Sequence, residues 1–261
     1  MTLTSLEEVL QKYPRVLVSL SGGIDSSVVA AVAARAKGDD ALAVTLTGPS
    51  LPTRDMAQAR SVAERAGIRL LVVPFDPLSD PDYVSNTSSR CYFCRRQEGH
   101  RLFEIAQEMG FEAVADGVHK DDLGTDRPGL KAMDELGMRH PLVEAGMGKA
   151  DVRAVGKELG LPNWETPSNA CLASRVIHGT PIRATDLSRI DQAEEYLTAL
   201  GFPLVRVRTN GTMARVEVAG SDLERLADPT VWDNVLAQLN RLGFASVAPF
   251  PVAYASGGRG A

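Results

Sequence analysis

The sequence predicts an α/β protein with a doubly wound, mostly parallel sheet, followed by a smaller C-terminal α+β domain. Short apolar runs alternate with helical patterns over the first two-thirds of the 261 residues, which is typical of parallel strands joined by crossover helices. The regular pattern stops at residues 163–181, and a hairpin signal, Asn210-Gly211, follows in the last third. The expected divisions are a first domain at 1–165, a loop or linker at 166–183, a small domain at 184–255 and a mobile tail at 256–261.

Each element of the first domain rests on its local pattern. Apolar runs between turn residues predict buried strands at 15–20, 41–47, 69–73 and 113–115. Helical periodicity predicts helices at 26–36, 54–66, 92–109 and 149–159. The second of these places Ala59, Val62 and Ala66 on one face before Gly67 ends it.

The last third has a different texture. A helix at 185–200 precedes two strand-like runs at 204–209 and 213–218, which flank the hairpin signal. Ser221 and Glu224 have the spacing of a capping box, which predicts the start of a short helix. A final helix at 231–242 and a short strand at 246–249 complete the small domain.

Composition limits the function classes. The 28 basic and 33 acidic residues give a net charge of −5, which argues against a broad nucleic-acid-binding surface. No run of 18 apolar residues is present, so no membrane span or membrane partner is expected. The N-terminal stretch is amphipathic and carries Glu7 and Glu8, unlike a secretory signal, so a cytoplasmic location is expected.

A glycine- and serine-rich string separates the first predicted strand from the first predicted helix. Its glycines permit a tight turn, and its hydroxyl groups and free N–H groups can surround an anion. The string lacks the lysine of G-x-x-x-x-G-K-[ST] and the spacing of G-x-G-x-x-G, and it resembles the SGGxDS loop of the ATP pyrophosphatases. Asp25 can hold Mg²⁺ on the phosphates, or it can simply cap the helix. The candidate ATP-binding residues of this loop are Ser21, Gly22, Gly23, Asp25, Ser26 and Ser27.

The three cysteines form an unusual set. Cys91 and Cys94 make a C-x-x-C flanked by arginines, which favour thiolate chemistry, and Cys171 follows 171 − 94 = 77 residues later. A four-thiolate zinc site is excluded because there is no fourth cysteine. Three thiolates could hold a 4Fe–4S cluster with one open iron. Three inert cysteines, a redox dithiol, or zinc with one histidine remain open, and the candidate histidines are His100, His119, His140 and His178.

Several uncommon blocks, spread in order along the chain, resemble the LarE family. They are RCYFCR, ADGVHKDDLGTDRPGLKA, RHPLVEAG with the following KADVR, PSNACLASR with the following GTPI, and the VRVR and ARVEV runs. The resemblance implies an adenine nucleotide alpha hydrolase-like PP-loop domain at 1–165. It also implies an ATP-dependent sulfur transferase, which forms AMP and pyrophosphate and converts the carboxylates of pyridinium-3,5-biscarboxylic acid mononucleotide to thiocarboxylates for the nickel-pincer nucleotide.

The resemblance assigns roles to matching residues. The SGGIDS loop binds ATP, Asp116 and Gly117 form a second nucleotide-contacting turn, and Arg127 lies near the phosphates. Cys171 matches the sulfur-bearing cysteine. In one branch of the family this cysteine gives up its sulfur, and in another three cysteines hold a cluster that carries an extra sulfide. The C-x-x-C places this sequence with the cluster branch, and the family association suggests trimers or hexamers and a sulfide donor of unknown identity.

Candidate substrate residues lie in the last third and in the irregular loop. Arg206 and Arg208 alternate, so they point to one face of a strand and could bind a phosphate, or they could form ion pairs with Glu194 and Glu195. Ser174 and Arg175 are close enough to Cys171 to position the acyl-adenylate. Two aromatic residues could stack on a pyridinium ring or serve only in packing, namely Tyr92 and Trp164.

Other functions use parts of the same pattern. An amidotransferase of the NAD or GMP synthetase type would use the same ATP chemistry with ammonia, but it has no use for the three thiols. A tRNA-thiolating enzyme would need a polynucleotide-binding surface, which the negative charge disfavours. A nucleotide-gated iron–sulfur sensor would bind ATP without forming pyrophosphate.

Overall fold

The computed structural model describes residues 2–124 and 127–255, which form two compact units. The first unit comprises Met1–Gly48, Thr53–Asp76 and Cys91–Asn169, and the second comprises Pro49–Pro52, Pro77–Arg90 and Ala170–Ala261. The second unit thus takes two segments from the N-terminal part of the chain, which linear boundaries at 165 and 184 do not include. The expected tail at 256–261 lies outside the described residues.

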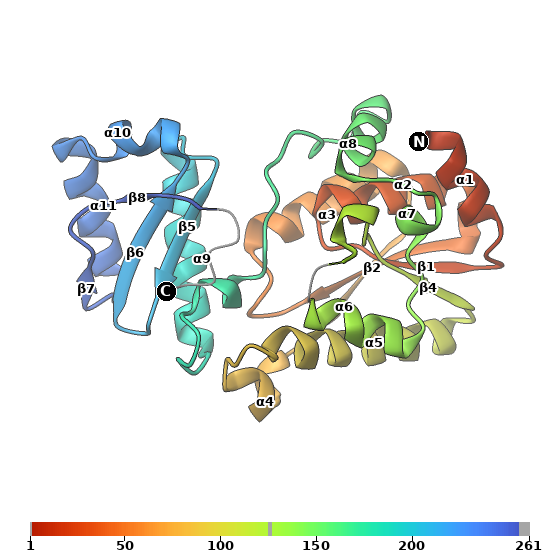
Figure 1. Ribbon diagram of the computed structural model, residues 1–261, viewed down its shortest axis with the longest axis horizontal. Helices are drawn as coiled ribbons and strands as arrows, with labels where there is room; N and C mark the ends of the chain where they lie inside the picture. The colour runs from red at the N-terminus through yellow and green to blue at the C-terminus, as the bar shows by residue number, and fades with distance from the viewer. Residues whose placement is uncertain (1, 125–126, 256–261) are drawn as a thin grey trace. The chain divides into compact units, whose positions relative to one another are not determined.

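The first unit is built on a four-stranded parallel sheet in the order β3-β2-β1-β4 (Figure 1). Its strands are β1 (Val16–Ser19), β2 (Ala41–Thr47), β3 (Leu70–Pro74) and β4 (Ala113–Ala115). The parallel order confirms the predicted α/β class. Because the chain runs outward from β1 to β3 and returns to the other side of β1, a topological switch point lies between β1 and β4, where ligands bind in such folds.

Helices cover both faces of this sheet, as a doubly wound fold requires. One face packs against α1 (Leu3–Gln11), α2 (Ile24–Lys37), α3 (Thr53–Ala66), α7 (Pro141–Glu144) and α8 (Lys149–Glu158). The opposite face packs against α5 (Arg90–Met109) and α6 (Pro128–Leu136). Successive strand residues alternate between the two cores: Val16 and Val18 face the α2 side, whereas Leu17 faces α5.

The second unit contains a mixed sheet and helices α4 (Pro81–Val84), α9 (Ala184–Ala199), α10 (Leu223–Leu226) and α11 (Pro229–Arg241). Strands β5 (Val205–Thr209) and β6 (Met213–Val218) form the predicted antiparallel hairpin. The Asn210 side chain accepts hydrogen bonds from Thr212 N and Met213 N and so fixes the turn. Two short strands, β7 (Ser246–Val247) and β8 (Val252–Ala253), pair in parallel with β6.

Some local predictions differ from the structure. The capping box at Ser221 and Glu224 is wrong: a 3₁₀ turn spans Gly220–Asp222, and α10 begins only at Leu223, without a side-chain cap. The helices α1, α4, α6 and α7 were not predicted; α6 and α7 each begin at a proline that fixes the first turn. Within residues 2–124 and 127–255, no helix is long and apolar enough to cross a membrane.

Candidate active site

The loop after β1 has the shape of an anion-binding turn, and two glycines create it. Gly22 has a φ of +84°, and a Cβ there would lie 2.1 Å from the Asp55 carbonyl oxygen. Gly23 is the N-cap of the 14-residue helix α2 and offers no side-chain cap. The first N–H groups of the helix therefore stay available at its positive end.

The serine side chains of this loop bond within it. Ser26 Oγ accepts a hydrogen bond from Ser21 N at 3.1 Å and donates to Gly23 O at 3.1 Å. Ser27 Oγ donates to Gly23 O at 2.8 Å. Asn163, a buried residue that sequence reasoning missed, donates to Gly22 O and to Ser27 Oγ. The hydroxyl groups of Ser26 and Ser27 thus shape the turn, and the donors left to face an anion are chiefly the backbone N–H groups.

Asp25 lies in the first turn of α2 and is engaged by a lysine. Lys149 Nζ donates to both Asp25 carboxylate oxygens, at 2.7 and 2.6 Å. Lys149 is the first residue of α8, and its backbone N–H donates to Asp121 at 2.7 Å. His119 Nε2 lies 3.9 Å from Asp25 Oδ1. Lys149 lies in the KADVR run that resembles the family, but the sequence alone assigns it no role.

The turn after β4 contacts the start of α2. A Cβ at Gly117 would lie 2.4 Å from Ser26 N, so only glycine allows this approach. The buried Asp116 accepts hydrogen bonds from Val118 N at 3.0 Å and Arg95 Nη2 at 3.2 Å. Asp116 and Gly117 therefore lie beside the SGGIDS loop, at the switch point of the sheet.

His140 is also bonded to Asp116 and was not predicted to lie here. Its Nδ1 is 2.7 Å from Asp116 Oδ1, and its Nε2 is 3.0 Å from Asp134 Oδ1. Burial alone would lower the pKa of His140, but the hydrogen bonds and Coulombic attraction of Asp116 and Asp134 outweigh burial and raise it. The raised pKa favours the protonated, positively charged form of the His140 ring beside the buried Asp116 carboxylate.

Arg127 and the C-x-x-C lie in the same unit. Arg127 is half exposed and forms an ion pair with Asp122 at 2.7 Å. Within the described part of the chain Cys91 and Cys94 form no disulfide, and they lie three residues apart in the first turns of α5. Cys91 is exposed, and the half-buried Cys94 Sγ lies 3.5 Å from Glu98 Oε1.

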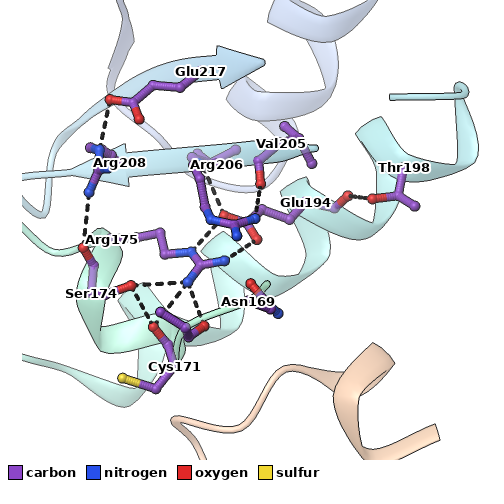
Figure 2. Close-up of polar contacts among 12 residues, drawn as sticks. Asn169, Cys171, Ser174, Arg175, Glu194, Thr198, Val205, Arg206, Arg208 and Glu217 are labelled. Atoms are coloured by element: carbon purple, nitrogen blue, oxygen red, sulfur yellow. Dashed lines mark hydrogen bonds and ion pairs between the residues drawn. The ribbon is translucent and has the colours of Figure 1, made fainter. Parts of the chain in front are cut away.

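The third cysteine belongs to the second unit. Cys171 precedes a 3₁₀ turn at Leu172–Arg175, is exposed, and directs its Sγ away from the Arg175 guanidinium (Figure 2). Arg175 is only 1% exposed, and its Nη1 donates to the carbonyl oxygens of Ala170 and Cys171 at 2.6 and 3.1 Å. Its Nε and Nη2 donate to both oxygens of the buried Glu194 at 2.9 Å. Arg175 therefore holds the cysteine loop in place.

Arg206 and Arg208 lie on one face of β5, as the alternation predicts. Arg206 is 5% exposed, donates to Val205 O at 2.7 Å and lies 5.6 Å from the Tyr254 ring centroid. Arg208 donates to Glu217 at 2.7 Å and to Ser174 O at 3.1 Å (Figure 2). Arg208 thereby connects the strand to the turn that follows Cys171. Ser174 Oγ itself donates to Cys171 O at 2.8 Å.

The remaining candidates have ordinary partners or exposed positions. Tyr92 OH donates to Glu135, and the Lys157 amine lies 4.9 Å from the Trp164 ring centroid. His100 and His178 are exposed. Among the residues that the structure describes, no three His, Cys, Asp or Glu side chains form a group able to hold a metal ion. Mg²⁺ needs no such group, because it commonly uses one or two carboxylates together with substrate phosphates and water.

Comparison with known proteins identifies the family. The NAD synthase family matches residues 2–100, which include the SGGIDS loop. A pyridinium-3,5-bisthiocarboxylic acid mononucleotide synthase of Lactiplantibacillus plantarum is 38% identical over 93% of this chain and 88% of its own. The chain belongs to the LarE family.

Other relatives differ in how much of the chain they match. An uncharacterized Synechocystis protein is 35% identical over 98% of this chain and 95% of its own length. A tRNA-specific 2-thiouridylase of Azorhizobium caulinodans is 33% identical, but the match covers 59% of this chain and 49% of that enzyme. The family match supports ATP use by the PP-loop domain of this LarE-family protein.

Proposed function

We propose that this LarE-family protein is an ATP-dependent sulfur transferase that makes pyridinium-3,5-bisthiocarboxylic acid mononucleotide from the biscarboxylic acid. The near full-length match to the synthase of that name carries the proposal. The glycine-shaped loop, with free N–H groups at the start of α2, supports the ATP half of the reaction. The protein is then an enzyme of nickel-pincer nucleotide biosynthesis.

In the first half-reaction, a substrate carboxylate oxygen attacks the α-phosphorus of ATP and pyrophosphate leaves. The N–H groups at Gly23–Ser26 would bind the leaving pyrophosphate oxygens. Asp25 would supply an oxygen ligand for Mg²⁺, which would neutralise phosphate charge when bound. Asp116, Gly117 and Arg127 would complete the nucleotide site.

In the second half-reaction, a sulfur nucleophile attacks the acyl carbon and AMP leaves. Cys171 is the candidate sulfur carrier, because its thiol is exposed on a loop held by Arg175. Ser174 and Arg175 would position that thiol toward the acyl carbon. Arg206 and Arg208 would bind the substrate phosphate. This role requires Arg208 to share its guanidinium with Glu217.

The source of the sulfur distinguishes two versions of this proposal. In the first version the three cysteines would hold a 4Fe–4S cluster, which is supported by the position of Cys91 and Cys94 at the start of one helix, three residues apart, and by the exposure of Cys171. Such a cluster would supply an open coordination position for sulfide. The alternative is that Cys171 gives up its own sulfur and becomes dehydroalanine. We favour the first version because a sacrificial mechanism has no use for Cys91 and Cys94. We also infer that the protein forms a homo-oligomer and receives sulfide from a separate donor.

The test is an anaerobic assay with ATP, Mg²⁺, the biscarboxylic acid mononucleotide and sulfide. We expect AMP, pyrophosphate and thiocarboxylate product, with several turnovers per protein and an unchanged protein mass. Iron and acid-labile sulfide should be present in protein purified without oxygen and absent from Cys91→Ala. A single turnover with loss of mass at Cys171 would contradict the cluster version, and no AMP in any condition would contradict the sulfur-transferase function itself.

One observation favours a second candidate function. The match to the NAD synthase family covers residues 2–100, where the ATP chemistry would be shared with an ammonia-using amidotransferase. Replacing sulfide with ammonia in the same assay separates the two activities. Amide product formed in preference to thiocarboxylate would favour the amidotransferase.

A further inference from the structure

Asn163 lies far from the SGGIDS loop in the sequence, and its side chain is hydrogen-bonded to that loop. It is only 1% exposed, and its Nδ2 donates to Gly22 O at 2.8 Å and to Ser27 Oγ at 2.9 Å. We propose that Asn163 is a positioning residue, which orients the N–H groups of the loop toward the pyrophosphate end of ATP. This inference rests on the proposed ATP-dependent function and adds to it a residue outside the loop.

Only one orientation of the Asn163 amide fits its surroundings. The Gly22 carbonyl oxygen can only accept, and Ser27 Oγ already uses its single hydrogen to donate to Gly23 O at 2.8 Å. Both groups therefore need a donor, and Nδ2 has two N–H bonds, one for each. In this orientation Oδ1 is buried without a hydrogen-bond partner among the described residues. An unsatisfied buried acceptor is destabilising, so the two donated bonds are the feature that this side chain provides.

Two consecutive carbonyl groups of the loop are thereby held in place. Asn163 binds Gly22 O directly, and it binds Gly23 O through the Ser27 hydroxyl group. A trans peptide is planar, and its C=O and the following N–H point in opposite directions. The N–H of Gly23 therefore points away from Asn163, and the N–H of Ile24 points away from the Ser27 hydroxyl group. These two donors lie at the start of α2, where the proposed function places the phosphates.

Asn163 can serve as a fixed support because α8 holds the turn on which it lies. Arg153, on α8, donates to the carbonyl oxygen of the next residue, Trp164, at 2.6 Å. A Cβ at Gly156 would lie 2.7 Å from Ile24 Cδ1, so α8 packs closely against the first turn of α2. The amide and the loop are therefore both fixed to the same pair of helices.

The experiment measures the binding of ATP, pyrophosphate and AMP by calorimetry, each with Mg²⁺, for the full-length protein and its variants. Asn163→Ala should bind ATP and pyrophosphate about tenfold more weakly than wild type, the effect of losing about one charge-assisted hydrogen bond. Its affinity for AMP should equal that of wild type, because AMP lacks the two phosphates that the loop is proposed to bind. An asparagine that served only to stabilise the fold would not distinguish these ligands.

Asn86→Gly is the matched control. Asn86 is also buried, and its amide donates to backbone carbonyl oxygens of the second unit, away from the proposed phosphate site. Glycine accepts its φ of +53°, so the variant removes the donors without adding backbone strain. Asn86→Gly should bind ATP, pyrophosphate and AMP as wild type does.

Ser27→Ala is the second test variant, and it keeps the proposal open to contradiction if Asn163→Ala does not fold. It removes only the path to Gly23 O, so it should weaken pyrophosphate binding by a smaller factor than Asn163→Ala. Thermal melting by circular dichroism shows which variants are folded.

The proposal would be overturned if folded Asn163→Ala bound ATP and pyrophosphate as wild type does, or lost AMP affinity by the same factor. If only Ser27→Ala folds, wild-type pyrophosphate affinity in that variant would overturn it. Absence of both ATP and pyrophosphate binding by the wild-type protein would instead contradict the proposed function on which the inference rests.

Discussion

The SGGIDS loop of the first unit and the Cys171 loop of the second unit are held in shape by different means. The SGGIDS loop depends on backbone geometry, because Gly22 allows a positive φ and a close approach to Asp55, and short serine side chains bond to Gly23 O. The Cys171 loop depends on a buried ion pair, because Arg175 joins Glu194 to the carbonyl oxygens of Ala170 and Cys171.

The difference follows from what each loop is proposed to do. A loop that binds phosphate must keep its N–H groups free, so its shape comes from glycine conformation and from hydroxyl groups bonded inward. A loop that presents a thiol must leave the sulfur exposed, so the loop is held instead by hydrogen bonds from a buried side chain to its backbone carbonyl groups. Substitution of a glycine should disrupt the loop that depends on backbone conformation, whereas substitution of a buried charge should disrupt the loop that depends on an ion pair. The comparison can therefore be tested by substitution.

The largest effect is expected for Arg175→Met. It removes the guanidinium that donates to both oxygens of the buried Glu194, and breaking a buried ion pair costs about 3–5 kcal/mol. Chemical denaturation should show this loss in the free energy of unfolding, and Arg175→Met with Glu194→Met should recover most of it. A single variant as stable as wild type would show that the pair does not hold the loop.

Gly22→Ala should have the next largest effect. Its Cβ would clash with the Asp55 carbonyl, and the positive φ adds strain, so together we expect a loss of about 2–4 kcal/mol and no measurable ATP binding. Gly38 is the control, because it has a φ of +54° with nothing within 4 Å of a Cβ. Gly38→Ala should lose stability through strain alone and keep its ATP affinity. Equal ATP affinities of Gly22→Ala and wild type would contradict the interpretation that glycine conformation shapes this loop.

The smallest effect concerns His140 and pH. Because its pKa is raised in the folded protein, its contribution to stability is fully present below about pH 6.5, the unfolded value, and is lost as pH rises through the folded value. His140→Gln should therefore unfold more easily than wild type by about 1–2 kcal/mol near pH 6, with a smaller difference near pH 9. The control variant His178→Gln, at an exposed position, should unfold as easily as wild type. A difference that grows with pH would contradict the charged His140.

Much of the first unit could be predicted from the sequence, because its signals are local. The four strands, the helices α2, α3, α5 and α8, and the SGGIDS loop each follow from an apolar run, a helical period or adjacent glycines. The hairpin at Asn210 is predictable for the same reason. Prolines at the start of α6 and α7 were a signal that could have revealed those helices.

The partners within the candidate site could not be predicted in the same way. Lys149 meets Asp25 across 124 residues, and Asn163 meets Gly22 across 141, so only the tertiary fold brings them together. The partner of Arg175 was likewise hidden, because Glu194 lies 19 residues away on a helix whose pattern gives no reason for a buried glutamate. An isolated sequence does not distinguish such a residue from an exposed one on the same helix.

We propose that the first unit activates a carboxylate with ATP and that Cys171 delivers sulfur to it. The most direct test measures AMP, pyrophosphate and thiocarboxylate in parallel for Asp25→Asn and Cys171→Ala, with the biscarboxylic acid mononucleotide as substrate. Asp25→Asn should form none of the three, whereas Cys171→Ala should still release AMP and pyrophosphate but form no thiocarboxylate. Thiocarboxylate formation by Cys171→Ala at the wild-type rate would contradict the account.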